Sequence, residues 1–431
     1  VEDLGQGDDT DKAFDPNNNF YYIPGEAFQV PEGYEPLGED GTFSTKDGKF
    51  AENPAKATGN DVFSATPGIN DWFETVKLNY GVDYENDRQQ YFDPVPDTWK
   101  KMRDILLFWA DKGVDGFRCD MAEMVPVEFW NWAVAQVKAE HPEIVFIAEI
   151  YNPGAYSEYI ETGGFDYLYD KVQLYDTLKH VMQQTGSTAN ITGIWQNLSG
   201  INKNMLRFLE NHDEQRIASP DFAGDAWKGV PAMLVSTGLY AGPVMVYFGQ
   251  ETGEPGQGAE GFGGEDGRTT IFDYWGVPAH QKWMNEGAFD GGQLSEQQRQ
   301  LRQFYQELLS FAKGSEALAK GKFFDLSAWN AQVPEDSAPP KTSTWAWLRY
   351  TDDEQLLLVA NFGKQQGRMQ LQLPQTMLQE WGAASIADLQ LQPVLPGVKK
   401  LKGTTLVEDG TLEITLPPNG VGIYRLSAGI R

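Results

Sequence analysis

The chain has 431 residues, 41% of them hydrophobic and 13% aromatic, and a formal net charge of −28. This length can bury the cores of two or three domains, while the acidity disfavours nucleic acid and anionic membranes as partners. No stretch reaches the roughly 20 apolar residues of a membrane span, and one cysteine with four histidines disfavours disulfides and a Cys/His zinc site.

Residues 1–92 are rich in Asn, Asp, Gly and Pro, and their aromatic residues follow neither a helical nor an alternating period. We predict an irregular segment here. Two oxygen-rich clusters, "GDDTDK" at 7–12 and "DPNNN" at 15–19, could hold a hard cation such as calcium, although such clusters usually form turns and caps.

Residues 93–317 alternate between short apolar runs and amphipathic helical patterns, which favours right-handed βαβ units and a parallel sheet. The first helix ends at Gly113, and we expect Trp109 and Trp130 to lie in the core. The predicted strands cover 114–120, 144–152, 165–170, 204–213 and 242–251, and the predicted helices cover 97–113, 126–141, 172–183, 228–237 and 295–314.

From residue 318 to residue 431 the hydrophobic period changes to two. Short alternating runs separated by turn residues are typical of antiparallel strands that form a β-sandwich. The sequence therefore predicts three parts: an irregular segment (1–92), a parallel α/β part (93–317) and a C-terminal sandwich (318–431). The predicted C-terminal strands include 342–350, 354–362, 367–373, 410–416 and 420–426.

Three of the predicted parallel strands end in a carboxylate: Asp120, Glu149 and Asp213. The carboxyl ends of parallel strands open on one face, so we expect these three side chains to converge on one pocket. Because side chains alternate along a strand, Arg118 should share the pocket side with Asp120, while Cys119 should face the core.

Paired carboxylates suit the cleavage of a glycosidic bond, in which one protonates the leaving oxygen and the other attacks the anomeric carbon. A separation of roughly 5 to 5.5 Å favours the retaining route through a covalent glycosyl-enzyme. The guanidinium of Arg118 should keep Asp120 ionised, which makes Asp120 the candidate nucleophile and Glu149 the candidate acid. Asp213, beside His212, can bind sugar hydroxyls and stabilise a cationic transition state.

The stretches "GVDGFRCDMA" (113–122), "FIAE" (146–149) and "FLENHD" (208–213) resemble, in order and spacing, three of the four signature regions of the α-amylase family of glycoside hydrolases. "VKLN" (76–79) is similar to a further short motif of that family. The resemblance implies a (β/α)8 TIM barrel, of which strands four to eight lie in this chain, with an irregular B-domain insertion and a C-terminal antiparallel β-sandwich.

Carried over to this sequence, the resemblance implies that Asp120 is the nucleophile, Glu149 the general acid/base and Asp213 the transition-state stabiliser. Arg118 and His212 would orient the substrate and the carboxylates. The implied activity is retaining hydrolysis of α-1,4-glucosidic bonds in starch, maltodextrin or related α-glucans. The alternatives are an α-glucan transglycosylase, a debranching or maltogenic enzyme, and a non-catalytic glucan-binding relative.

The sequence departs from the family in two places. The fourth signature, at the end of the third barrel strand, is absent, so we expect a longer polypeptide or a companion N-terminal segment to complete the barrel. The stretch "MAEM" (121–124) stands where many members have a Lys-His pair near a calcium site, so calcium there is doubtful and no metal ligand is assigned.

Aromatic residues near strand ends or in the irregular segment can stack on sugar faces, and ordinary packing is an equal alternative for each. The candidates for substrate binding are Trp72, Tyr151 and Tyr247. The acidity suits an extracellular or periplasmic protein, although a mature chain would look the same in any compartment.

Overall fold

The computed structural model describes residues 4–32, 52–257, 266–269, 277–331, 342–408 and 410–428. The chain divides into two compact units, each described below by itself. Unit 1 comprises Val1–Glu149 and Ser157–Asp166, and unit 2 comprises Ile150–Tyr156 and Tyr167–Arg431. In the described ranges, no helix is long and apolar enough to cross a membrane.

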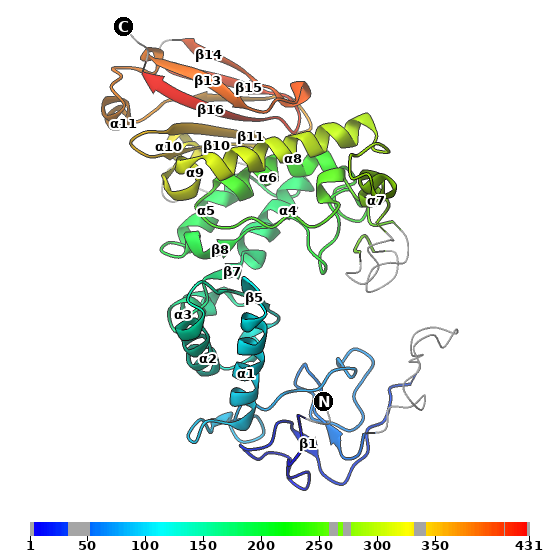
Figure 1. The fold of residues 1–431 in the computed structure, drawn as a ribbon. Helices are drawn as coiled ribbons and strands as arrows, with labels where there is room; N and C mark the ends of the chain where they lie inside the picture. The colour runs from blue at the N-terminus through cyan, green and yellow to red at the C-terminus, as the bar shows by residue number, and fades with distance from the viewer. Residues whose placement is uncertain are drawn as a thin grey trace. The chain divides into compact units, whose positions relative to one another are not determined.

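Unit 1 begins with an irregular segment, as its turn-rich composition predicts. Its regular structure in the described part is limited to two short antiparallel ladders and an isolated antiparallel bridge between Phe20 and Leu78 (Figure 1). The ladders are β1 (Tyr22–Ile23) with β2 (Ala55–Lys56), and β3 (Val82–Asp83) with β4 (Gln89–Gln90). Aromatic rings rather than a sheet form much of its interior: Tyr21 meets both Phe63 and Tyr84 edge-on.

The rest of unit 1 is built around a parallel βαβ unit. Strands β5 (Gly116–Cys119) and β6 (Val145–Ala148) pair in parallel, with Phe117 opposite Phe146. Helix α2 (Val127–Glu140) connects them, and α1 (Asp97–Asp111) packs beside α2 (Figure 1). Helix α3 (Tyr156–Glu161) follows β6. These elements match the strands and helices that the sequence predicts for 97–152.

Helix α1 differs from the sequence prediction in what it buries. Its chain reverses at Gly113, whose φ of 86° favours glycine, as expected of a residue after a helix end. However, Trp109 is 51% exposed, and Ile105 and Phe108 beside it are also exposed. The expectation that Trp109 lies in a core is therefore wrong for unit 1, because no described element of unit 1 covers this face. Trp130, on α2, is buried as expected.

The first part of unit 2 consists mainly of helices around a short parallel ladder. Strand β7 (Tyr167–Tyr169) pairs in parallel with β8 (Met205–Leu206), and an isolated parallel bridge joins Arg207 to Val244. The predicted strand at 242–251 is thus reduced to this bridge in the described residues. The helices are α4 (Asp176–Met182), α5 (Asn190–Asn197), α6 (Gly229–Gly238), α7 (Pro278–Met284), α8 (Glu296–Gly314) and α9 (Glu316–Lys320).

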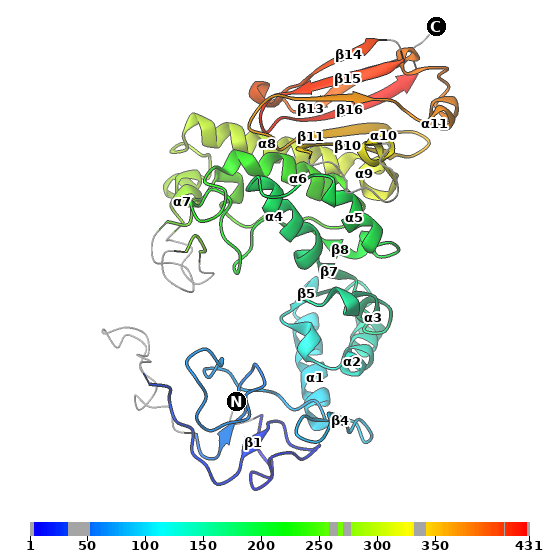
Figure 2. The same cartoon turned by 180° about the vertical axis from the view of Figure 1, so that it is seen from behind.

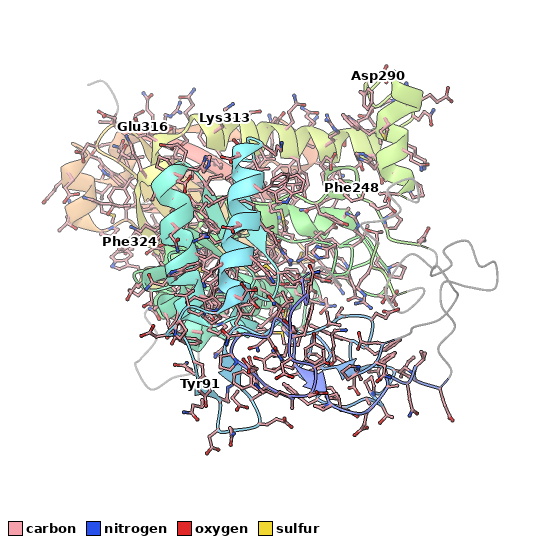
Figure 3. The ribbon with its side chains drawn as sticks, turned by 60° about the horizontal axis from the view of Figure 1, so that its bottom comes forward. Tyr91, Phe248, Asp290, Lys313, Glu316 and Phe324 are labelled. Atoms are coloured by element: carbon pink, nitrogen blue, oxygen red, sulfur yellow. The ribbon has the colours of Figure 1, made fainter. Side chains whose placement is uncertain are left out.

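Helix α8 illustrates how local sequence sets an element of unit 2. Ser295 caps its N-terminus, and Gln298 completes a capping box. Its apolar residues recur at helical spacing, so Leu301, Phe304 and Leu308 are buried on one face. In Figure 3 the helix runs between the labelled Asp290 and Lys313.

The C-terminal part of unit 2 is an antiparallel sandwich of two sheets (Figures 1 and 2). One sheet has the strand order β13-β16-β11-β10-β9 and the other β12-β15-β14. The strands are β9 (Lys322–Asp325), β10 (Thr344–Tyr350), β11 (Gln355–Asn361), β12 (Gly367–Leu371), β13 (Leu389–Leu395), β14 (Thr404–Glu408), β15 (Thr411–Leu416) and β16 (Val421–Ala428), with α10 (Leu326–Ala331) and α11 (Gln375–Glu380) between strands.

Strands β10 and β11 of the five-stranded sheet are buried on both faces. Leu348 and Val359 face the other sheet in one apolar cluster, while Trp347 and Leu358 belong to a second cluster that includes α6. The indole N–H of Trp347 donates to the carbonyl oxygen of Gly238 at 2.9 Å. Strands β10 and β11 therefore do not show the predicted period of two, because they are covered on both sides and buried along nearly their whole length.

In the described residues, β5 with β6 and β7 with β8 do not make up a closed barrel. The assignment of these strands as numbers four to eight of a (β/α)8 barrel stays a prediction, and so do the domain boundaries after residues 92 and 317.

Candidate active site

Asp120 and Glu149 stand at equivalent positions at the ends of two paired strands. Cys119 lies opposite Ala148 in the ladder, and each carboxylate residue comes next along its chain. The Glu149 N–H donates to the carbonyl oxygen of Cys119 at 3.0 Å, which continues the pairing past the last strand residue. The parallel register thus brings these two predicted site residues to the same edge of unit 1.

Arg118 joins the two carboxylates. Its Nη1 pairs with Oδ1 of Asp120, and its Nη2 lies 3.0 Å from Oε2 of Glu149. The same Glu149 oxygen accepts the backbone N–H of Met121 at 2.9 Å. A planar guanidinium can serve two carboxylates at once, and its charge offsets their mutual repulsion.

The two carboxylates differ in exposure. The Glu149 side chain is 4% exposed and the Asp120 side chain is 75% exposed, with Arg118 at 26% between them. The turn that separates Asp120 from α2 includes Met121, whose φ of 42° is unusual for a residue other than glycine. Met121 thereby directs its N–H to Glu149, so this backbone geometry positions the site.

Cys119 lies on the core side, as alternation predicts. Its side chain is buried, and burial raises the pKa of its thiol to about 12, against a smaller opposing effect of Arg118. A thiol in this state is not a nucleophile at neutral pH.

Asp213 and His212 lie in unit 2, in the segment that follows β8. His212 Nε2 is 3.1 Å from Oδ2 of Asp213. The side chain of Asn211 fixes the turn, because its Oδ1 accepts the N–H groups of Asp213 (2.9 Å) and Glu214 (2.8 Å). The convergence of Asp213 with Asp120 and Glu149, which lie in the other unit, stays a prediction.

A buried ion pair beside this turn was not found from the sequence. Glu210 and Arg216 are 2% and 0% exposed, and Oε2 of Glu210 lies 2.8 Å from Nη1 of Arg216. Glu210 also accepts the Ile217 N–H at 2.8 Å. Burial raises the pKa of Glu210, and Arg216 opposes that rise. Two opposite charges six residues apart in "ENHDEQR" were the available signal, but only the fold brings them together.

The predicted sugar-stacking residues have different surroundings. Trp72 is 46% exposed in the irregular segment of unit 1, with a positive φ of 44°. Tyr247 in unit 2 lies against the Arg216 guanidinium, 4.3 Å from its ring centroid. Tyr151, also in unit 2, is half-buried. Sugar binding by these three residues stays a prediction.

The acidic clusters near the N-terminus make internal hydrogen bonds. Asp8 accepts from the Asn19 backbone and side chain at 2.8 and 2.9 Å and from the Tyr22 hydroxyl at 3.0 Å. Asp15 pairs with Lys12 at 2.7 Å. Among the described residues, no three His, Cys, Asp or Glu side chains gather as a metal site would require. These contacts support the interpretation as turns and caps, and calcium binding stays untested.

The family model for the alpha-amylase catalytic domain matches residues 70–286, half of the chain, and this range includes Asp120, Glu149 and Asp213. The chain belongs to the alpha-amylase family. The resemblance drawn from the short motifs is therefore confirmed at the level of the family.

Among curated proteins, this alpha-amylase family chain is similar to an alpha-1,4-glucan:maltose-1-phosphate maltosyltransferase of Cereibacter sphaeroides, with 39% identity over 104 residues. A protein of the same name from Pseudomonas aeruginosa is 31% identical over 113 residues. Each match covers 24% of this chain but only 14% and 17% of the respective relative. The chain thus spans a small part of the length of these relatives.

Solved structures of other family members share the fold. The alpha-amylase of Geobacillus thermoleovorans superposes with a TM-score of 0.58 at 16% identity, covering 83% of this chain and 67% of that one. The Anoxybacillus alpha-amylase gives 0.57 at 17% identity, with coverage of 83% and 66%. The predicted fold class is therefore confirmed as that of the alpha-amylases, without its strand-by-strand details.

Proposed function

We propose that this chain carries the catalytic centre of a retaining α-glucan-active enzyme that transfers a glycosyl unit from an α-1,4-linked donor to an acceptor sugar. The observation that carries the proposal is the pair of strand-end carboxylates, Asp120 and Glu149, bridged by Arg118. The family membership supports an α-glucan-active enzyme, and the maltosyltransferase name of the partial relatives supports transfer over hydrolysis.

In the proposed first step, an Asp120 oxygen forms a bond to the anomeric carbon. The bond to the glycosidic oxygen breaks with its electron pair, and the protonated carboxyl group of Glu149 gives that oxygen its proton. In the second step the ionised Glu149 takes a proton from the incoming hydroxyl group, whose oxygen displaces Asp120. Arg118 holds both carboxylates in position, and Asp213 with His212 would stabilise the sugar in the transition state.

Hydrolysis is the second candidate, because it differs only in using water as the acceptor. The observation that favours it is the 75% exposure of the Asp120 side chain, which leaves water access to the covalent intermediate. A non-catalytic glucan-binding role is less well supported, since Asp120, Glu149 and Asp213 are all present.

The test is product analysis by mass spectrometry after incubation with maltoheptaose, with and without added maltose, and in parallel with maltose 1-phosphate as donor. Transfer predicts oligosaccharides longer than the substrate, whereas hydrolysis predicts only shorter ones. Asp120→Asn should lower either activity by at least about 1,000-fold, because the nucleophile is lost. Asp104→Asn, an exposed position on α1, is the matched control and should keep full activity. Equal turnover in both variants would contradict the assignment of Asp120.

We also propose that a further polypeptide segment covers part of unit 1. Ile105, Phe108 and Trp109 form an exposed apolar face on α1, and of the described strands of unit 1 only β6 pairs with β5. A companion strand and helix would pair with the free edge of β5 and bury that face.

An extracellular or periplasmic location is a proposal that rests on the net charge of −28 and is tested by cell fractionation.

A further inference from the structure

Unit 1 contains a pocket lined by residues other than Arg118, Asp120 and Glu149. It has a volume of about 190 Å³ and lies between the β3–β4 hairpin and the segment that leads from β5 into α2. This volume equals that of about six water molecules, which suits a single small ring rather than a large ligand. Glu123, in its wall, is three residues beyond Asp120.

The lining combines hydrogen-bonding groups with an apolar wall. Arg88, Gln90, Glu123 and Glu128 contribute the polar groups, and Val82, Val125 and Pro126 contribute apolar surface. A sugar ring has the matching character, because hydroxyl groups surround faces made of C–H bonds. Two carboxylates against one guanidinium disfavour an anionic ligand, so a neutral sugar fits better than a sugar phosphate.

Hydrogen bonds hold the walls of this pocket in place. The Tyr159 hydroxyl contacts the carbonyl oxygens of Glu123 (3.3 Å) and Val125 (3.0 Å), and the Tyr21 hydroxyl donates to the carbonyl oxygen of Val82 at 2.7 Å. The hairpin is closed by the N–H of Tyr91, labelled in Figure 3, which donates to Gly81 at 2.8 Å. A pocket with fixed walls loses little entropy when a ligand binds.

The backbone at Arg88 gives an independent indication. Asp87 and Arg88 have φ angles of 49° and 55°, in the left-handed region where glycine or asparagine would be the favoured residues of a tight turn. Asp87 lies outside the pocket lining, whereas Arg88 lines it and lies 4.6 Å from the centroid of the Tyr84 ring. Of these two strained residues, only Arg88 presents its side chain to the pocket.

We propose that this pocket binds one glucose unit of an α-glucan chain, separately from the site of bond cleavage. The identity of the sugar rests on the proposed function, whereas the preference for a neutral polyhydroxyl ligand rests on the lining itself. Bound glucan would thereby be held beside the segment that carries Asp120 and Met121.

The experiment is titration calorimetry with maltotriose in the Asp120→Asn background, which prevents turnover. Arg88→Gly removes the guanidinium and relieves the backbone, so this variant should fold normally, as checked by circular dichroism. Asp87→Gly is the matched control, because it relieves the adjacent residue without changing the lining. Glu128→Gln provides a second, nearly isosteric variant.

We expect Arg88→Gly to weaken the binding of maltotriose to one class of sites at least tenfold, and Glu128→Gln to weaken binding to the same class. Asp87→Gly should bind maltotriose like the Asp120→Asn parent. Glucose 1-phosphate should not compete for this class. Identical isotherms in Arg88→Gly and Asp87→Gly would overturn the proposal, as would tighter binding of the phosphate. If Arg88→Gly weakens this class as expected but the chain with Asp120 intact does not turn over maltoheptaose, the proposed function would be contradicted and the pocket supported.

Discussion

The two strand ends that carry the predicted catalytic residues are built differently. After β5 and β6, Arg118 joins the exposed carboxylate of Asp120 to the buried carboxylate of Glu149 at the end of the ladder. After β8, the turn with His212 and Asp213 is flanked by a buried ion pair, Glu210 with Arg216. The first arrangement leaves the Asp120 carboxylate accessible to a substrate, while in the second both partners of the ion pair are buried.

This difference predicts that the ion pairs at the two strand ends affect different properties of the protein, catalysis at the first and stability at the second. The pair of Arg118 with the exposed Asp120 contributes little to folding, because water competes for the Asp120 charge. A buried pair is costly to break, because the remaining partner is left as an uncompensated charge. Substitutions at Arg118 should therefore act mainly on catalysis, and substitutions at Arg216 mainly on the stability of unit 2.

The largest effect on the free energy of unfolding is expected for the substitution Arg216→Met. It leaves Glu210 buried without its positively charged partner, so the free energy of unfolding should fall by about 3–5 kcal/mol, measured by urea denaturation. Adding Glu210→Gln removes the buried charge but keeps an acceptor for the Ile217 N–H, and the double variant should recover more than half of the loss. A single variant as stable as the wild type would show that the pair does not hold the turn.

Arg118→Lys tests the other strand end. Lysine keeps the charge but cannot bridge two carboxylates with a rigid fork, so the turnover of maltoheptaose should fall by roughly 10- to 100-fold. Because lysine keeps a positive charge beside the buried Glu149 carboxylate, and the pair with Asp120 is exposed, the free energy of unfolding should change by less than about 1 kcal/mol. Full activity in this variant would mean that bridging is unimportant, and a large loss of stability would remove the contrast with Arg216.

For Glu354, in unit 2, we expect a smaller effect on the free energy of unfolding than for Arg216. Burial by itself raises its pKa, but hydrogen bonds from the Ser315 hydroxyl, the Ala317 N–H and Arg425 outweigh burial and hold the pKa below its ordinary value of 4.5. The ionised form is favoured in the folded state, so its contribution is complete above the unfolded pKa and is lost as the pH falls through the folded one.

Glu354→Gln should accordingly lower the free energy of unfolding by about 1 kcal/mol at neutral pH. The difference from the wild type should shrink as the pH is lowered from about 7 to about 3 in a series of denaturation curves. Glu380→Gln, at an exposed position on α11, serves as the control and should follow the wild type throughout. A difference that stays constant with pH would exclude the ionised carboxylate as its source.

The smallest effect on the free energy of unfolding is expected for a substitution on the exposed face of α1. Trp109→Ser should change the free energy of unfolding of this chain by no more than about 0.5 kcal/mol, because the side chain is already 51% exposed. The same change should also lower self-association in analytical ultracentrifugation, since it removes exposed apolar surface. A loss above about 2 kcal/mol would show that Trp109 packs against part of this chain.

Local sequence was sufficient where a residue's role depends on its own strand or turn. Alternation along "GFRCD" placed Cys119 in the core and Arg118 on the side of Asp120, and the turn-rich composition of the N-terminal segment agrees with its irregular structure. The capping residues of α8 and the alternating strands β12 and β15 of the sandwich likewise follow from short stretches. These features involve neighbours in sequence, so their physical causes are visible there.

Tertiary structure decided what depends on distant partners. Amphipathic spacing predicted helix α1 but could not show that Trp109 would stay exposed, because burial requires a covering element and not a pattern alone. Glu210 and Arg216 became an ion pair, and Arg88 came to line a pocket with Glu128, only because separate segments fold against each other. The sequence by itself determined the family and named the candidate catalytic residues, whereas the burial and pairing of these side chains were set by the packing of elements far apart in the chain.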